Sequence, residues 1–131
     1  MIGLDTNVLV RYIMQDDPKQ SAKASALIDA LDGADTGYIT LVSIVELVWV
    51  LSFSYDLSRA QVAAALDAIV RTKQFKIEAA DQVVRALRVF KAGKADFADC
   101  LIERSAAQAG CLRTMTFDVG AAKHAGMTLV T

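Results

Sequence analysis

The chain has 131 residues, of which 54% are hydrophobic and 22% are charged. This apolar content excludes an intrinsically disordered protein, and the length suits a single domain with a core of its own. Its 14 basic residues nearly balance its 15 acidic residues, which excludes a protein that binds polyanions through bulk charge alone.

Short apolar segments alternate with amphipathic ones along the chain. We expect strands at residues 1–4, 38–40, 75–77, 111–115 and 127–130. We expect helices at residues 6–14, 18–31, 43–54, 58–70, 79–92, 95–109 and 118–124. This alternation is typical of a parallel sheet with helices on both faces. The sequence therefore predicts one three-layer α/β/α domain, residues 1–131, with a short parallel sheet of four to five strands.

Two of the helix starts carry local capping signals. Asp17 precedes Pro18, and these residue types suit the N-cap and the first helical position. Ser58 and Gln61 have the spacing of a capping box. Both patterns depend only on neighbouring residues, so they indicate where these two helices begin.

The cysteines and the N-terminus indicate a cytoplasmic protein. Cys100 and Cys111 match no CxxC or zinc spacing, so we expect reduced thiols and leave a redox role open. Met1 is followed at once by strand-like sequence, so no signal peptide is expected. The apolar run 38–55 contains the charged residue Glu46 and is expected to form a buried strand and helix rather than a membrane span.

Four acidic residues occupy positions that a solvated surface does not explain. Asp5 and Asp118 follow the first and fourth predicted strands, and the carboxyl ends of parallel strands form the usual ligand site of such sheets. Glu46 lies within a very apolar helix. Asp99 shares a helix face with Asp96, three residues before it, and is followed by apolar residues.

Each of these positions also has a purely structural interpretation. Asp5, Asp96 and Asp118 each lie at the start of a predicted helix and suit its N-cap. Ser43 and Glu46 are spaced as a capping box. The spacing leaves both interpretations open, with Asp96 as a further candidate ligand.

A shared metal site would explain why acidic groups gather at one sheet edge. Two unit charges 4 Å apart repel by about 4 kcal/mol at an effective dielectric constant of 20, so the carboxylates need a cation. Ligands that are all oxygen suit Mg²⁺ or Mn²⁺, which activate water for attack on phosphodiesters. Asn7 is placed to brace the first acid. The predicted metal-binding and catalytic residues are Asp5, Glu46, Asp99 and Asp118.

The missing motifs exclude other chemistries. The lone histidine, His124, excludes a two-histidine nuclease mechanism and a histidine-rich zinc site within this chain. No GxSxG, GxxxxGK[ST] or GxGxxG motif is present, which excludes the serine hydrolase, P-loop and dinucleotide-binding classes.

The ordered set of acidic motifs resembles the PIN-domain ribonucleases, specifically the VapC toxins of VapBC-type toxin–antitoxin pairs. No single motif is specific, but together they span nearly the whole chain. The segments that carry the resemblance are Leu4-Asp5-Thr6-Asn7-Val8-Leu9, Ser43-x-x-Glu46, Asp96-Phe97-Ala98-Asp99-Cys100-Leu101-Ile102 and Thr116-Phe117-Asp118. Cys100 stands where alanine is often found in the family.

The resemblance implies a compact α/β/α fold and Mg²⁺-dependent hydrolysis of RNA by an endonuclease. It also implies a homodimer and neutralisation by a small cognate antitoxin protein. In this interpretation Asp5, Asp99 and Asp118 hold one or two metal ions, while Glu46 orients or deprotonates the attacking water. The RNA, its cleavage site and the antitoxin are left open.

Two further groups of residues are candidate contact surfaces. Basic side chains recur at three-residue steps before the Asp96 motif, and they suit either RNA phosphates or a solvated helix face. They are Arg85, Arg88, Lys91 and Lys94. Trp49, Phe53 and Tyr55 suit the core, an antitoxin groove or a dimer face.

Two other functions remain as alternatives. One is a non-catalytic protein-binding module of the same fold, in which the acids serve only as helix caps. The other is a metal-dependent phosphatase or phospho-acceptor with Asp5 as nucleophile. This second alternative is weakened because Asn7 stands where a DxDxT arrangement has its second aspartate.

Overall fold

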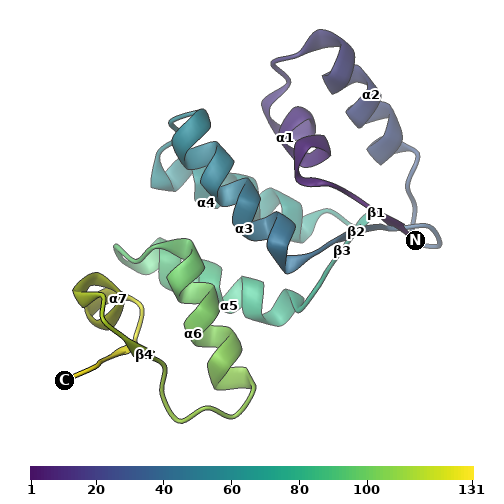
Figure 1. Cartoon of the computed structure of the whole chain (residues 1–131). Helices are drawn as coiled ribbons and strands as arrows, with labels where there is room; N and C mark the ends of the chain where they lie inside the picture. The colour runs from purple at the N-terminus through teal and green to yellow at the C-terminus, as the bar shows by residue number, and fades with distance from the viewer. The chain divides into compact units, whose positions relative to one another are not determined.

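The computed structural model describes all residues from 1 to 131. Helices and short parallel strands alternate along the chain, as the sequence predicts (Figure 1). The chain forms two compact units, Met1–Glu78 and Ala79–Thr131. No helix combines the length and the apolar character needed to cross a lipid bilayer.

The first unit contains a parallel three-stranded sheet. Its strands are β1 (Ile2–Gly3), β2 (Gly37–Ile39) and β3 (Phe75–Ile77), in the order β1-β2-β3. Its helical segments are α1 (Thr6–Met14), α2 (Pro18–Asp29), α3 (Leu41–Trp49), the π-helical turn η1 (Val50–Ser54) and α4 (Arg59–Arg71). Tyr38 of β2 pairs with Gly3 on one side and Lys76 on the other. Since the strands are parallel, their carboxyl ends lie at one edge.

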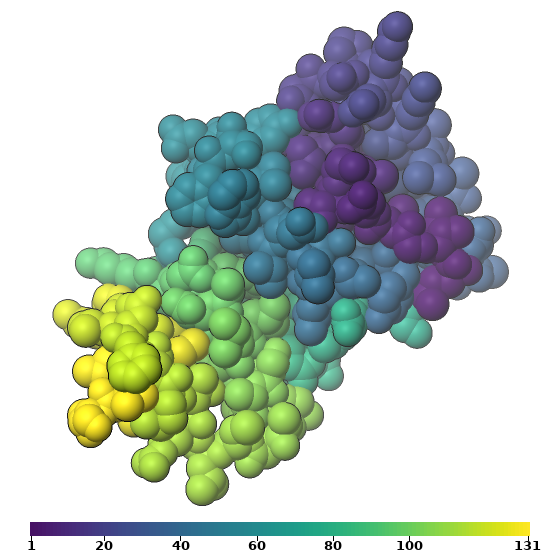
Figure 2. Space-filling model, in the orientation of Figure 1, coloured from purple at the N-terminus to yellow at the C-terminus, as the bar shows by residue number.

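Apolar side chains from the sheet and its helices form the core of the first unit. Figure 2 shows the outer atoms of this unit, beneath which these core side chains lie. Those with no exposed surface are Leu9, Ile28, Ile39, Ile44, Leu47, Leu51 and Leu66. Full burial of such a side chain stabilises the folded state by about 1.5–3 kcal/mol. Leu27 of α2 lies outside this core and is 40% exposed.

Close packing fixes the chain where β1 ends. A Cβ atom at Gly37 would lie 2.6 Å from Leu4 Cδ1, so only glycine fits against β1 without movement. Leu4 is 5% exposed, and its N–H donates to the Tyr38 carbonyl oxygen at 2.9 Å. The residue after Leu4 therefore leaves the sheet from a defined position.

The second unit contains two packed helices and a parallel strand pair. Its elements are α5 (Ala80–Ala92), α6 (Phe97–Gln108), β4 (Met115–Thr116), α7 (Val119–His124) and β5 (Thr128–Leu129). Met115 pairs with Thr128 in the two-stranded sheet. The rings of Phe90 and Phe97 meet edge to face, with centroids 5.8 Å apart. One face of α5 is buried, and it comprises Val83, Leu87 and Phe90.

The α/β fold class is confirmed. All five predicted strands are present and parallel, three in one sheet and two in the other. Every predicted helix is found within a few residues of its expected bounds, and β3 and α1 match them fully. The fourth strand is shorter than expected and begins at Met115, not at Cys111. The division into one domain over residues 1–131 stays a prediction.

The helix expected at residues 43–54 differs from the prediction at both ends. It begins at Leu41, because the Thr40 hydroxyl accepts a hydrogen bond from the Ser43 N–H at 3.1 Å and caps it. It ends at Trp49, and the next five residues form a π-helical turn in which the Tyr55 N–H donates to the Val50 carbonyl at 3.2 Å. Of the two interpretations of Glu46 that the spacing left open, the capping box with Ser43 is therefore wrong.

Candidate active site

Asp5 lies at the carboxyl end of β1 and caps α1. Its Oδ1 accepts a hydrogen bond of 2.7 Å from the Thr6 N–H, and its backbone is extended, as an N-cap requires. The side chain is exposed, and no protein group donates to its Oδ2. Asp5 therefore serves as a cap and still presents one carboxylate oxygen to solvent.

Glu46 is joined to the same turn by a hydrogen bond from Thr6. The Thr6 hydroxyl, which is buried, donates to Glu46 Oε1 at 2.8 Å. One residue thus holds two carboxylates, that of Asp5 through its backbone N–H and that of Glu46 through its hydroxyl. Glu46 is exposed despite its apolar flanks, and its Oε2 has no hydrogen-bond donor.

Glu46 does not cap its own helix. With Thr40 as the N-cap, Glu46 stands well inside α3 and does not reach the helix start. The structural explanation for an acid at this position is thereby removed. Its partner is Thr6, which is 40 residues away in sequence, and no local pattern indicates that contact.

A cavity of about 430 Å³ brings these groups together within the first unit. The two acids line it with Thr6 and Asn7, so Asn7 lies beside Asp5 as expected. The remaining lining residues are Val10, Arg11, Val50, Ser54 and Tyr55. Sequence reasoning missed Arg11 and Tyr55 as members of this cavity, because they lie 44 residues apart and belong to no shared motif.

The second unit holds the other two predicted acids. Asp96 caps α6 by accepting a hydrogen bond of 3.1 Å from the Asp99 N–H, which places Asp99 at the third helical position as predicted. Asp118 caps α7, and its Oδ1 accepts from the N–H groups of Gly120 at 2.7 Å and Ala121 at 3.2 Å. Both predicted N-caps are therefore confirmed.

The electrostatics of the second unit show that its acids are neighbours. Burial raises the pKa of Asp99 above its ordinary value, and the negative charges of Asp96 and Asp118 raise it further. Repulsion of this kind requires carboxylates that lie close together in a partly dry environment. A cation near Asp99 would offset this repulsion.

Each unit thus contributes two of the four predicted acids. Asp5 and Glu46 share a cavity in the first unit, and Asp99 and Asp118 interact in the second. No group of three or more acidic, histidine or cysteine side chains is arranged to hold a metal ion. The union of the two pairs in one centre stays a prediction.

The donor chemistry of the four acids fits a hard divalent cation. Hydrogen bonds use one oxygen each on Asp5, Glu46 and Asp118, and none reaches the carboxylate of Asp99. Every member therefore keeps at least one free oxygen, and the first three side chains are oriented by their other oxygen. Carboxylate oxygens are the ligands that Mg²⁺ and Mn²⁺ prefer.

The raised pKa of Asp99 predicts a pH-dependent gain in stability when its charge is removed. The pKa of Asp99 is higher in the folded state than in the unfolded state. At pH values between these two pKa values the folded state binds more protons, so the free energy of unfolding falls as the pH rises through this range. We expect Asp99→Asn to increase the free energy of unfolding at neutral pH. The gain should vanish below the ordinary aspartate pKa of about 3.9.

Urea denaturation at neutral and acidic pH measures this effect. Asp81→Asn is the matched control, because Asp81 also lies in the first turn of a helix, where the helix dipole favours an acid. That substitution should not stabilise the protein. Equal effects of the two substitutions at neutral pH would contradict the proposed repulsion at Asp99.

Comparison with known proteins places this arrangement in a family. Residues 2–127, which include all four acids, match the family model described as PIN domain. None of the curated proteins compared with the sequence matches it significantly. PIN domains are generally nucleases, and they typically use divalent metal ions. The chain belongs to the PIN domain family.

Proposed function

We propose that this PIN domain is a Mg²⁺-dependent endoribonuclease, and that it acts in the cytoplasm as a VapC-type toxin of a toxin–antitoxin pair. The observation that carries the nuclease proposal is the pair of carboxylates, Asp5 and Glu46, held on one cavity wall by Thr6. Their chemistry suits metal-assisted hydrolysis of a phosphodiester.

In the proposed centre Asp5, Asp99 and Asp118 would hold the ion or ions through carboxylate oxygens. When bound, such an ion would lower the pKa of a bound water and offset charge that develops on the phosphate. The remaining oxygen of Glu46 accepts a proton from the attacking water, since Oε1 is engaged by the Thr6 hydroxyl.

A protein partner is supported by an apolar stripe on α3 and η1. Val42, Trp49 and Phe53 are 70%, 59% and 71% exposed, and the two aromatic rings touch, with centroids 5.5 Å apart. Placement of Trp49 and Phe53 in the core is therefore wrong, whereas Tyr55 is half-buried. Exposed apolar surface of this kind marks interaction sites, which supports an antitoxin and a second copy of the chain as partners.

The basic residues of the second unit support an RNA substrate. Arg85, Arg88, Lys91 and Lys94, along α5 and just after it, are all exposed. Exposed cations at this spacing gain affinity for RNA by displacing the counterions of its phosphates. We propose that some of them contact the RNA backbone.

The helix caps favour one alternative function. Asp5 and Asp118 both accept backbone hydrogen bonds at helix starts, which is all that a non-catalytic binding module would require of them. That alternative gives Glu46 no role, because Glu46 caps no helix and is held by Thr6 instead. Metal-dependent cleavage separates the two functions.

The first prediction of this function concerns Asp5. With Mg²⁺ or Mn²⁺ the protein should cleave RNA, and EDTA should stop the reaction. Loss of a residue that only supports a metal ligand typically costs about 10–100-fold in activity. Asp5→Asn should reduce the cleavage rate by more than this, because Asp5 is proposed to be a ligand itself. Asparagine caps helices as well as aspartate does, so the fold should be kept. Gel analysis of a labelled RNA measures the rate.

Asp17→Asn is the matched control for Asp5→Asn. Asp17 caps α2 by accepting a hydrogen bond from the Gln20 N–H, and it does not line the acidic cavity. Its substitution should leave cleavage unchanged. Cleavage that persists in EDTA, or that survives Asp5→Asn, would exclude the proposed mechanism.

The second prediction concerns Thr6. Thr6→Val keeps the shape of the side chain and the backbone bond to Asp5 but removes the hydroxyl that holds Glu46. We expect kcat to fall by about 10–100-fold, the usual cost of losing a partner that orients a metal-site carboxylate. Thr6→Ser restores the hydroxyl and should recover most of the rate. If both variants cleave RNA like the wild type, the bond has no catalytic role.

A further inference from the structure

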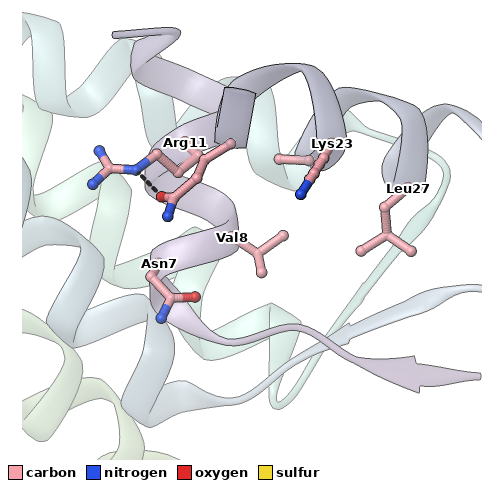
Figure 3. A pocket seen from close by; sticks show the side chains of 7 residues that line it. Asn7, Val8, Arg11, Lys23 and Leu27 are labelled. Atoms are coloured by element: carbon pink, nitrogen blue, oxygen red, sulfur yellow. Dashed lines mark hydrogen bonds between the residues drawn. The ribbon is translucent and has the colours of Figure 1, made fainter. Parts of the chain in front are cut away.

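Arg11 is the one cation that lines the acidic cavity, and three separate segments hold its guanidinium. Arg11 lies in the last turn of α1, and its Nε donates to Gln20 Oε1 of α2 at 2.7 Å, the bond drawn as a dashed line in Figure 3. Its NH1 donates to Asp16 Oδ1 at 3.2 Å and to the Tyr55 hydroxyl at 3.0 Å. The side chain is 30% exposed.

The π-helical turn supplies the third of these contacts. Such turns place one more residue in a helical turn than an α-helix does, and they often occur at functional sites. Tyr55 follows η1 directly, and its hydroxyl donates to Asp16 Oδ2 at 2.7 Å while it accepts from Arg11. This hydrogen bond to Asp16 raises the pKa of Tyr55 and lowers that of Asp16. The hydrogen bond to Tyr55 raises the pKa of Arg11, which stays charged.

A donor count shows that Arg11 has hydrogen-bonding capacity left. A guanidinium carries five N–H donors. The single Nε donor and the NH1 group are engaged by Gln20, Asp16 and Tyr55. The NH2 group makes no hydrogen bond with the protein. Arg11 is therefore a fixed, charged side chain with a pair of donors available to a ligand.

Arg11 also joins the acidic cavity to a second one. A cavity of about 500 Å³ between α1 and α2 shares Asn7 and Arg11 with the first, and Figure 3 shows Lys23 and Leu27 of α2 opposite Val8 of α1 on its walls. Lys23 is exposed and makes no ion pair. An anion in this second cavity would meet two cations and no carboxylate in its lining.

We propose that Arg11, with Lys23, binds a backbone phosphate of the RNA next to the linkage that is cleaved at Asp5 and Glu46. The three side chains that hold Arg11 are positioning residues, which present its free NH2 group to the phosphate. Arginine–phosphate hydrogen bonds are short, strong and directional, so a fixed guanidinium sets the register of the strand. This inference rests on the proposed nuclease function.

RNA binding at increasing NaCl concentration tests the role of Arg11. The probe is a fluorescent single-stranded RNA oligonucleotide with the Asp5→Asn protein, which should bind without cleavage. We expect the added Arg11→Gln substitution to weaken binding about tenfold and to reduce the salt slope by about 0.7, the value for one phosphate contact on a single strand. Arg11→Lys keeps the positive charge but loses the paired N–H donors of the guanidinium. Its RNA affinity should lie between that of the protein with Arg11 and that of the Arg11→Gln variant.

Lys19→Gln is the matched control. Lys19 is an exposed cation on α2 that lines neither cavity, so its loss should leave the affinity and the salt slope almost unchanged. If Arg11→Gln and Lys19→Gln behave alike while the parent protein binds RNA, the role of Arg11 is overturned and the nuclease proposal stands. If the parent neither binds nor cleaves RNA, the proposed function fails as well.

A double-mutant cycle tests the positioning role of Tyr55. Tyr55→Phe removes the hydroxyl without a change of charge, and it should weaken RNA binding when Arg11 is present. In the Arg11→Gln background it should have no further effect, because it acts through Arg11. Equal losses in both backgrounds would show that Tyr55 acts by another route. Thermal unfolding of each variant separates these outcomes from a loss of folded protein.

Discussion

The proposed site depends on one hydrogen bond, from the Thr6 hydroxyl to the carboxylate of Glu46, 2.8 Å long. It ties the turn after β1 to α3, two elements far apart in sequence. The same residue gives its backbone N–H to Asp5, so the relative positions of two acids depend on one buried threonine. Without this bond, Asp5 would be only a helix cap and Glu46 only a surface acid.

Charge is arranged differently around the two acid pairs. In the second unit burial raises the pKa of Asp99, and the two carboxylates of Asp96 and Asp118 raise it further, a repulsion that a bound cation would relieve. In the first unit Arg11 lies on the wall of the acidic cavity. Groups that destabilise a fold yet suit a ligand are typical of functional sites. The proposed site would therefore take both a cation and an anionic substrate.

Local signals predicted the fold well, and long-range contacts limited the prediction of the site. The caps at Asp17, Ser58 and Asp96 form as expected, because each depends on residues within one helical turn. The capping box of Glu46 fails, since Thr40 offers an earlier cap and starts the helix sooner. The contact of Arg11 with the hydroxyl after η1 joins residues 44 apart and depends on a π turn that periodicity does not reveal.

The central proposal is that Asp5, Glu46, Asp99 and Asp118 form one metal centre. Calorimetric titration with Mg²⁺ of the wild type, Asp5→Asn and Asp118→Asn tests it most directly, because each variant removes one charge from one unit and asparagine keeps the helix cap. The account predicts one specific binding event that both substitutions weaken strongly. It would be contradicted if the wild type showed no specific binding, or if Asp118→Asn bound Mg²⁺ as tightly as the wild type.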